Sequence, residues 1–216
     1  MNEALILGLQ EYLERQLGSS ELAQFYTDAL WQLALPWKES APSPRKANLI
    51  MAFAFGQRRD LNGNALPDPI VSPRLKRLLH ETASTLKCNR GYVQWEIAEA
   101  NGPPIPAEMK VIRPRLNPED ATPTYLSTED ICTAAAEDVV DPKSLTVCVL
   151  SHRHHAWRCV RAVRSFGFQA WAPYEDLPDQ YDGASSQPWC RSGEQYIIHD
   201  LISRLRWFRP GRQGGP

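Results

Sequence analysis

The segment 145–167 limits the possible folds more than any other part of the chain. Leu145–Leu150 is a short apolar run rich in β-branched residues, which is typical of a strand buried on both faces. Trp157, Val160 and Val163 then recur at helical spacing, and a glycine follows where such a helix would end. We therefore predict a strand, a polar loop and a helix, the unit from which parallel α/β sheets are built.

The chain from residue 48 onward repeats this alternation of strands and helices. Apolar or alternating runs predict further strands at 48–55, 92–98 and 168–173. Helices are predicted from Ser72-Pro73, with the serine as cap, over the alanine-rich residues 128–139, and after a Ser192/Gln195 capping box, where Ile197, Ile198, Leu201 and Leu205 would form the buried face. The predicted fold class is α/β, a three-layer Rossmann-like domain with a mostly parallel sheet.

The first 45 residues have a different pattern from the rest. Apolar stripes predict one amphipathic helix over 4–17 and a second that starts at Ser19 or Ser20 and stops at Pro36. A linker rich in proline and serine follows at 38–46. We predict a helical pair with its linker at 1–45, the Rossmann-like domain at 46–208 and a disordered tail at 209–216. The pair would cover the sheet or mediate self-association into a homo-oligomer.

Composition excludes several function classes. The 216 residues carry a net charge of −1, so no global field attracts nucleic acid or an anionic membrane. No apolar run has the length of a spanning helix, and the first residues lack the basic start of a signal peptide. The five cysteines form no CxxC pair, which is typical of incidental thiols in a reducing compartment. We expect a cytoplasmic protein whose partner is a small molecule.

The loop of the 145–167 unit holds the first group of candidate site residues. In open α/β sheets, ligands bind outside the carboxyl ends of the strands, which is where this loop lies. His155 and Arg158 suit recognition of an anion at a helix N-terminus, since the helix dipole and the guanidinium both favour negative charge. The alternative is a solvated turn. Ser151 is a candidate nucleophile with His154 or His155 as base, although no Gly-x-Ser-x-Gly elbow surrounds it.

A metal site is a second interpretation of the same loop. If the strand pattern continued, His152 and His154 would lie on one face, as imidazole ligands require, with His155 beside them. A further ligand would have to come from Asp60, Glu99 or Asp176. Isolated histidine clusters are frequent false positives, so we expect no resident metal.

Three other groups of polar residues follow predicted strands or open helices. Gly56, Arg58 and Arg59 come after the first strand and suit phosphate or ribose, or form a solvated loop. Glu96 and Glu99 flank the end of the second strand and offer a general base or a ligand anchor, or pair structurally with an arginine. The last group opens the alanine-rich helix, where helix capping alone would also explain it: Ser127, Thr128, Glu129 and Asp130.

These pieces resemble the YdcF/SanA/ElyC-type family of Rossmann-like proteins. The family's strand-loop-helix reads Val-Thr-Ser-x-Tyr-His-Met-x-Arg-Ala, and Ser151, His155 and Arg158 fall at its threonine, histidine and arginine. Ser127–Asp130 matches the family's Thr-x-Glu-Asn helix start loosely. The family's second strand ends in Ser-Gly-Gly, whereas this chain has Ile97-Ala-Glu-Ala-Asn-Gly102. The chain resembles a divergent member without a membrane anchor.

The resemblance implies a small-molecule-binding protein, with S-adenosylmethionine or a nucleotide-like anion as the expected ligand. In that interpretation the ligand lies at the carboxyl ends of the strands and the activity is group transfer to a small metabolite. Arg158 would hold the anionic end, His155 would orient or exchange a proton with the reacting group, and Glu96 or Glu99 would take a polar or cationic end. A metal-dependent hydrolase using His152, His154 and His155, or a non-catalytic interaction module, remains as an alternative.

Overall fold

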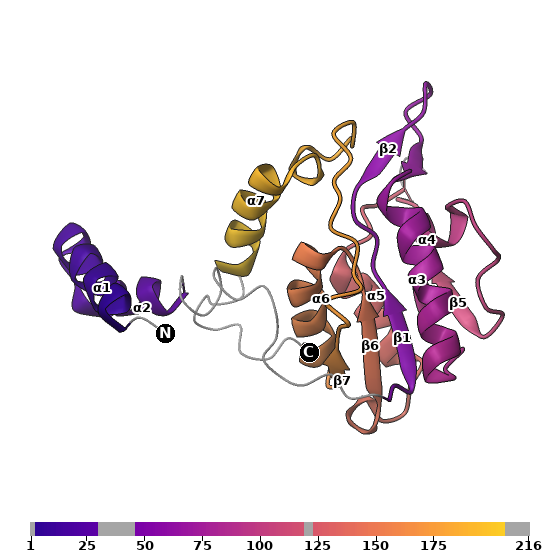
Figure 1. Cartoon of the computed structure of the whole chain (residues 1–216), viewed down its shortest axis with the longest axis horizontal. Coiled ribbons are helices and arrows are strands. Elements are labelled where there is room, and N and C mark those ends of the chain that lie inside the picture. The colour runs from indigo at the N-terminus through magenta and orange to yellow at the C-terminus, as the bar shows by residue number, and fades with distance from the viewer. Residues whose placement is uncertain (1–2, 30–45, 119–122, 206–216) are drawn as a thin grey trace.

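A computed structural model describes residues 3–29, 46–118 and 123–205, and its centre is a parallel five-stranded sheet (Figure 1). The sheet order is β5-β4-β1-β6-β7. The strands are β1 (Leu49–Ala52), β4 (Gly91–Gln94), β5 (Met109–Ile112), β6 (Thr146–Leu150) and β7 (Gln169–Trp171). The chain builds outward from β1 to β5, returns to lay β6 on the other side of β1, and ends at β7. The predicted Rossmann-like α/β fold is confirmed.

Helices cover both faces of the sheet, which makes three layers (Figure 1). α3 (Val71–Leu86) and the short α4 (Trp95–Glu99) pack together, while α5 (Thr128–Glu137) packs against α6 (Arg153–Ser165). The α3 face that meets the sheet carries Val71, Leu75, Leu79 and Ala83, a spacing of four residues that places them on one stripe. β1 is buried on both sides, as the apolar run predicts.

The second predicted strand was too long. Strand β4 stops at Gln94, and the residues that continue the alternating pattern turn into α4. Lys76 of α3 is 4% exposed, and its ammonium donates to the carbonyls of Ala98 and Ala100 at the end of α4. These bonds satisfy carbonyl groups that a helix end leaves without partners. A lysine 22 residues away in sequence thus helps to hold a helix that local alternation does not predict.

Two further local predictions were wrong. The predicted polar loop after Gly56 is a hairpin, β2 (Gln57–Arg59) paired with β3 (Ala65–Pro67). Asp60 closes its turn by accepting from the amides of Asn62 and Asn64. Helix α3 starts at Val71, and Ser72 does not cap it; Asp68 accepts from the amides of Ile70 and Val71 instead. By contrast, the helix capping that the sequence suggests at residues 127–130 is present, as a capping box between Ser127 and Asp130.

The final helix, α7 (Gly193–Leu205), buries the opposite face from the predicted one. Ile197, Ile198 and Ile202 are 45%, 64% and 51% exposed, whereas Tyr196, Asp200 and Arg204 are buried. The reason is that α7 meets α6 at charged and aromatic side chains, which the site described below contains. The apolar periodicity of α7 therefore marks its outer face.

The N-terminal helical pair consists of α1 (Glu3–Leu17) and α2 (Ser20–Ala29), joined at Gly18 with a φ of 64°. The two helices pack against each other, and Figure 1 shows them to one side of the sheet and not over a face of it. Leu7, Leu17, Leu22 and Tyr26 are exposed on the pair, so self-association stays a prediction. The predicted linker and tail lie outside the described residues. In the described part of the chain, no helix is long and apolar enough to cross a membrane.

Gly91 provides a test of the sheet. A Cβ at this position would lie 2.0 Å from the carbonyl oxygen of Ile50 in β1, so neighbouring main chain would have to move. We expect Gly91→Ala to lower the free energy of unfolding by more than about 3 kcal/mol, measured by urea denaturation followed by tryptophan fluorescence. Gly183→Ala is the control, because nothing lies within 4 Å of the added atom, and it should change stability by less than about 0.5 kcal/mol. Equal losses in the two variants would contradict the close packing of β4 on β1.

Candidate functional site

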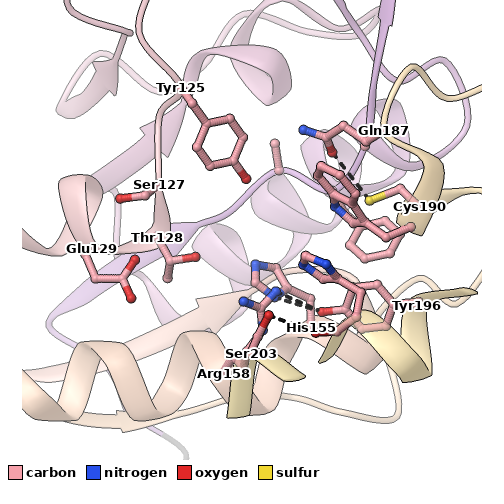
Figure 2. A pocket seen from close by; sticks show the side chains of 15 residues that line it. Tyr125, Ser127, Thr128, Glu129, His155, Arg158, Gln187, Cys190, Tyr196 and Ser203 are labelled. Atoms are coloured by element: carbon pink, nitrogen blue, oxygen red, sulfur yellow. Dashed lines mark hydrogen bonds between the residues drawn. The ribbon is translucent and has the colours of Figure 1, made fainter. Parts of the chain in front are cut away.

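A pocket of about 350 Å³ lies where the chain leaves the carboxyl ends of β1 and β6 (Figure 2). Strands β1 and β6 are neighbours, but their following helices, α3 and α6, run on opposite faces of the sheet. This is the switch point at which open α/β sheets form a crevice for ligands. The pocket has three walls, from the segment after β1, from the start of α5, and from α6 facing α7.

The first wall is the segment 54–56, which follows β1 after Phe53. The amide of Ala54 donates to Gln94 Oε1 across the sheet, and this bond fixes where the segment leaves β1. Gly56 has a φ of 77°, and a Cβ there would lie 2.9 Å from Asp68 Oδ2. Only glycine accepts both that conformation and that contact. Gly56 thus lines the pocket as the chain turns away into β2.

The second wall is the N-terminus of α5. The Ser127 hydroxyl accepts from the amide of Asp130, and Asp130 accepts in return from the amide of Ser127. This capping box directs Asp130 toward the helix end, and Asp130 does not line the pocket. Thr128 and Glu129, the first two residues of the helix, do line it (Figure 2). A helix N-terminus carries a partial positive charge, so this wall favours an anion.

The third wall centres on Tyr196, whose hydroxyl joins α6 to α7. It lies 3.1 Å from His155 Nδ1, 3.2 Å from Arg158 Nη2 and 3.4 Å from Asp200 Oδ1. Arg158 Nη2 also lies 3.1 Å from His155 Nδ1, and Arg158 Nε lies 2.9 Å from Asp200 Oδ1. One edge of the guanidinium is therefore held by three side chains.

The same network determines the protonation state of His155. An arginine has no lone pair to offer, so a hydrogen bond from Arg158 Nη2 to His155 Nδ1 requires the tautomer in which the ring proton sits on Nε2. Burial lowers the pKa of His155 well below its usual value, and the charge of Arg158 lowers it further. His155 is therefore neutral near pH 7 and presents an N–H to the pocket.

Behind the third wall, Asp200 pairs with a second arginine, Arg204. The guanidinium carbon of Arg204 lies 4.3 Å from the centre of the Trp157 ring, which is a cation–π contact. Burial raises the pKa of Asp200, and the positive charges of Arg204 and Arg158 counteract that rise. A carboxylate shared by two arginines anchors α7 to α6 and sets the position of Arg158.

The other residues of the α6 loop do not converge on a metal ion. His152 caps α6: its Nδ1 accepts from the amide of His154, and its Nε2 donates to the carbonyl of Gln180. The His152 ring stacks on Phe55 at 3.9 Å, and burial lowers its pKa to about 3. His154 bonds to Tyr181 through Nδ1. Across residues 3–29, 46–118 and 123–205, no three histidine, cysteine or acidic side chains form a group that could hold a metal.

Several predicted site residues lie outside the pocket. Ser151 is fully buried and accepts from the thiol of Cys159, so it is not placed as a nucleophile. Arg58 pairs with Asp182 at 2.6 Å and fastens β2 to the loop before α7. Arg59 donates to the carbonyl of Gly63 in the hairpin turn, and Glu99 pairs with Arg113 at the surface.

Glu96 is the remaining candidate, and it lies behind the first wall and not in the pocket. It is 6% exposed, and its Oε1 accepts from the side chain of Gln94, the residue that holds Ala54. Its Oε2 is buried without a hydrogen-bond partner. Burial raises the pKa of Glu96 to about 7, because the ionised form has lost its water.

Sequence patterns missed most of the wall that faces α6. The residues concerned are Gln187, Trp189, Cys190, Tyr196, His199 and Ser203, together with Tyr125 from the segment before α5. Tyr196, His199 and Ser203 are spaced by three and four residues, which places them on one helical stripe. That polar and aromatic stripe could have indicated which face of α7 lines the pocket. The sequence analysis overlooked it because the isoleucines of the same helix predicted a different buried face.

The raised pKa of Glu96 predicts that the free energy of unfolding depends on pH. The folded chain keeps a proton on Glu96 that the unfolded chain releases above its ordinary pKa of 4.5, so this group costs stability as the pH rises from 4.5 to 7. The full cost above pH 7 is about 3 kcal/mol. Glu96→Gln should therefore match the wild type at pH 4 and unfold at higher denaturant at pH 8. Glu99→Gln is the exposed control, with a change below about 1 kcal/mol. A pH-independent difference for Glu96→Gln would contradict the assignment.

Comparison with protein-family models, curated proteins and solved structures finds no match. The resemblance of the 145–167 unit to the YdcF/SanA/ElyC-type family therefore stays a prediction from the sequence. The assignment of a Rossmann-like fold is based on the order and direction of the strands.

Proposed function

We propose that this chain binds a small organic anion in the pocket between α5, α6 and α7. The observation that carries the proposal is how Arg158 is held. Nη2 bonds to Tyr196 and His155, and Nε forms an ion pair with Asp200, while Nη1 bonds to no residue in the described part of the chain. The Arg158 side chain is 21% exposed, whereas Tyr196 and His155 in the same wall are 1% and 7% exposed. A cation held in this way keeps the two N–H groups of Nη1 in reserve for a ligand.

Two further donors converge on the same end of the pocket. The Nε2–H of His155 makes no hydrogen bond within the described residues, and the first turn of α5 supplies Thr128 with its hydroxyl. An anion placed here would receive a charge-assisted bond from Arg158, a neutral one from His155 and the field of the α5 N-terminus. Because all three are fixed before the ligand arrives, little side-chain entropy is lost on binding.

Carboxylates suit this arrangement better than phosphates do. Phosphate sites in α/β folds use a glycine-rich turn that brings several backbone amides to the anion. Here β1 is followed by Phe53-Ala54-Phe55-Gly56, and β4 is followed by the buried Trp95 and Glu96. Of the groups in S-adenosylmethionine, the carboxylate matches the donors, so this cofactor remains among the ligands to test. A nucleotide would have to bind without a phosphate cradle.

If the bound molecule also reacts, these residues bind and orient it. His155 acts as a hydrogen-bond donor and not as a base, because its only lone pair already accepts from Arg158. Burial raises the pKa of the Cys190 thiol to about 12, so this pocket thiol is protonated near pH 7. In group transfer, the protein would hold the carboxylate end of the ligand at Arg158. The rest of the ligand would then lie beside Tyr125 and Gln187. The metal-dependent hydrolase has less support, since the nitrogens of His152 are both engaged.

The test is binding by the wild type and by Arg158→Lys, which keeps a charge beside Asp200 but loses the planar fork. A thermal-shift panel would contain simple carboxylates, nucleoside phosphates, S-adenosylmethionine and divalent metals. We expect carboxylate-bearing ligands to stabilise the wild type, by about 2.7 kcal/mol at 100 times the dissociation constant. We expect the affinity of Arg158→Lys for these ligands to be at least about tenfold lower than that of the wild type.

The matched control is Arg161→Lys, on the same helix but exposed and outside the pocket. It should keep wild-type affinity. Circular dichroism of each variant confirms that it folds. Stabilisation by metals alone, or equal binding by Arg158→Lys and the wild type, would contradict the proposed anion site.

A further inference from the structure

The described residues that line the pocket include one arginine and one acidic residue, and these two are not paired with each other. Arg158 comes from α6, and Glu129 comes from the first turn of α5. Arg158 turns its bound edge to Asp200, and Glu129 makes no ion pair or hydrogen bond within the described residues. Figure 2 shows the Glu129 carboxylate on the α5 side of the pocket, across from the ring of Tyr125 and beside Thr128.

An acidic side chain beside an anion site narrows the choice of ligand. It repels a ligand with two or more negative charges, and it attracts one that carries a positive group next to its carboxylate. The helix N-terminus alone explains why an acid is tolerated at Glu129. It does not explain why that acid borders the same cavity as the open edge of Arg158.

The far end of the pocket is aromatic. The Trp189 ring stacks on His199 with centroids 4.7 Å apart and planes 10° apart, and Tyr125 enters from the segment before α5. Gln187 accepts from the Cys190 thiol through Oε1, which leaves its amide NH₂ toward the pocket (Figure 2). A flat, largely apolar group is therefore the natural neighbour of this end.

We propose that the ligand is a zwitterion of the α-amino acid type with an aromatic side chain. Its carboxylate lies against Arg158 and His155, its ammonium against Glu129, and its ring between Tyr125 and the Trp189–His199 stack. This inference rests on the proposed function and goes further, because it assigns Glu129 to the ligand's positive group. It makes Glu129 the residue that distinguishes an amino acid from a simple carboxylate.

Four probes that share one aromatic ring separate the contributions of the ammonium and the carboxylate to binding. They are L-phenylalanine, 3-phenyllactate with a hydroxyl in place of the ammonium, 3-phenylpropionate without either, and phenethylamine without the carboxylate. Titration calorimetry on the full chain should give the tightest binding for L-phenylalanine. Because Glu129 is exposed, loss of the ammonium should weaken binding by roughly fivefold, as is usual for a pair of exposed charges. Phenethylamine should bind worst if the carboxylate anchors the ligand.

Glu129→Gln tests the assignment without changing the shape of the side chain. It should remove the preference for L-phenylalanine over 3-phenyllactate and leave the affinity for 3-phenylpropionate unchanged or higher. Glu137→Gln, exposed at the other end of α5, is the matched control and should behave as the wild type. Equal affinities for L-phenylalanine and 3-phenylpropionate in the wild type would overturn the zwitterion and leave the anion site standing. Binding of none of the carboxylate probes, with stabilisation by a phosphate or a metal, would overturn both.

Discussion

The shared carboxylate of Asp200 is the interaction on which the pocket depends. It lies between Arg158 of α6 and Arg204 of α7, so it both attaches a helix to the domain and sets the direction of the arginine that faces the pocket. Ion pairs taken out of water gain little net energy, but loss of one partner leaves an uncompensated buried charge. These three charged residues therefore mainly fix where α7 lies, because α7 has few other positions in which all of their charges find partners.

The same three charged residues explain why α7 buries its polar face and exposes its isoleucines. An amphipathic helix normally buries its isoleucines, and the periodicity of residues 197–205 predicts that outcome. Here Tyr196, Asp200 and Arg204 are spaced by four residues and form the inner stripe instead. Periodicity shows that two faces exist, but the choice between them depends on what α6 offers. Arg158 and Trp157 come from that earlier helix, far from α7 in sequence.

Local sequence predicts the sheet much better than the site. Strand β6 and helix α6 follow directly from apolar runs and spacing, since burial on both faces forces such a pattern. Strand β4 was overextended because Trp95 and Ile97 are buried in a helix as well as they would be in a strand. For the site, His155 and Arg158 were found because they follow a strand, as the fold requires. Tyr125 and Gln187 were missed because nothing near them in sequence indicates a pocket.

Strand β1 has one more consequence, which concerns how the chain folds. Its neighbours are β4, about 40 residues later, and β6, where Leu49 lies beside Val147. During synthesis the central strand therefore leaves the ribosome well before the strand that completes its second edge. Until β6 follows, the apolar run 49–52 has an open edge, which is the kind of surface that pairs with other chains. A sheet closed by such distant contacts folds slowly for its size, and its nascent form is the state most exposed to aggregation.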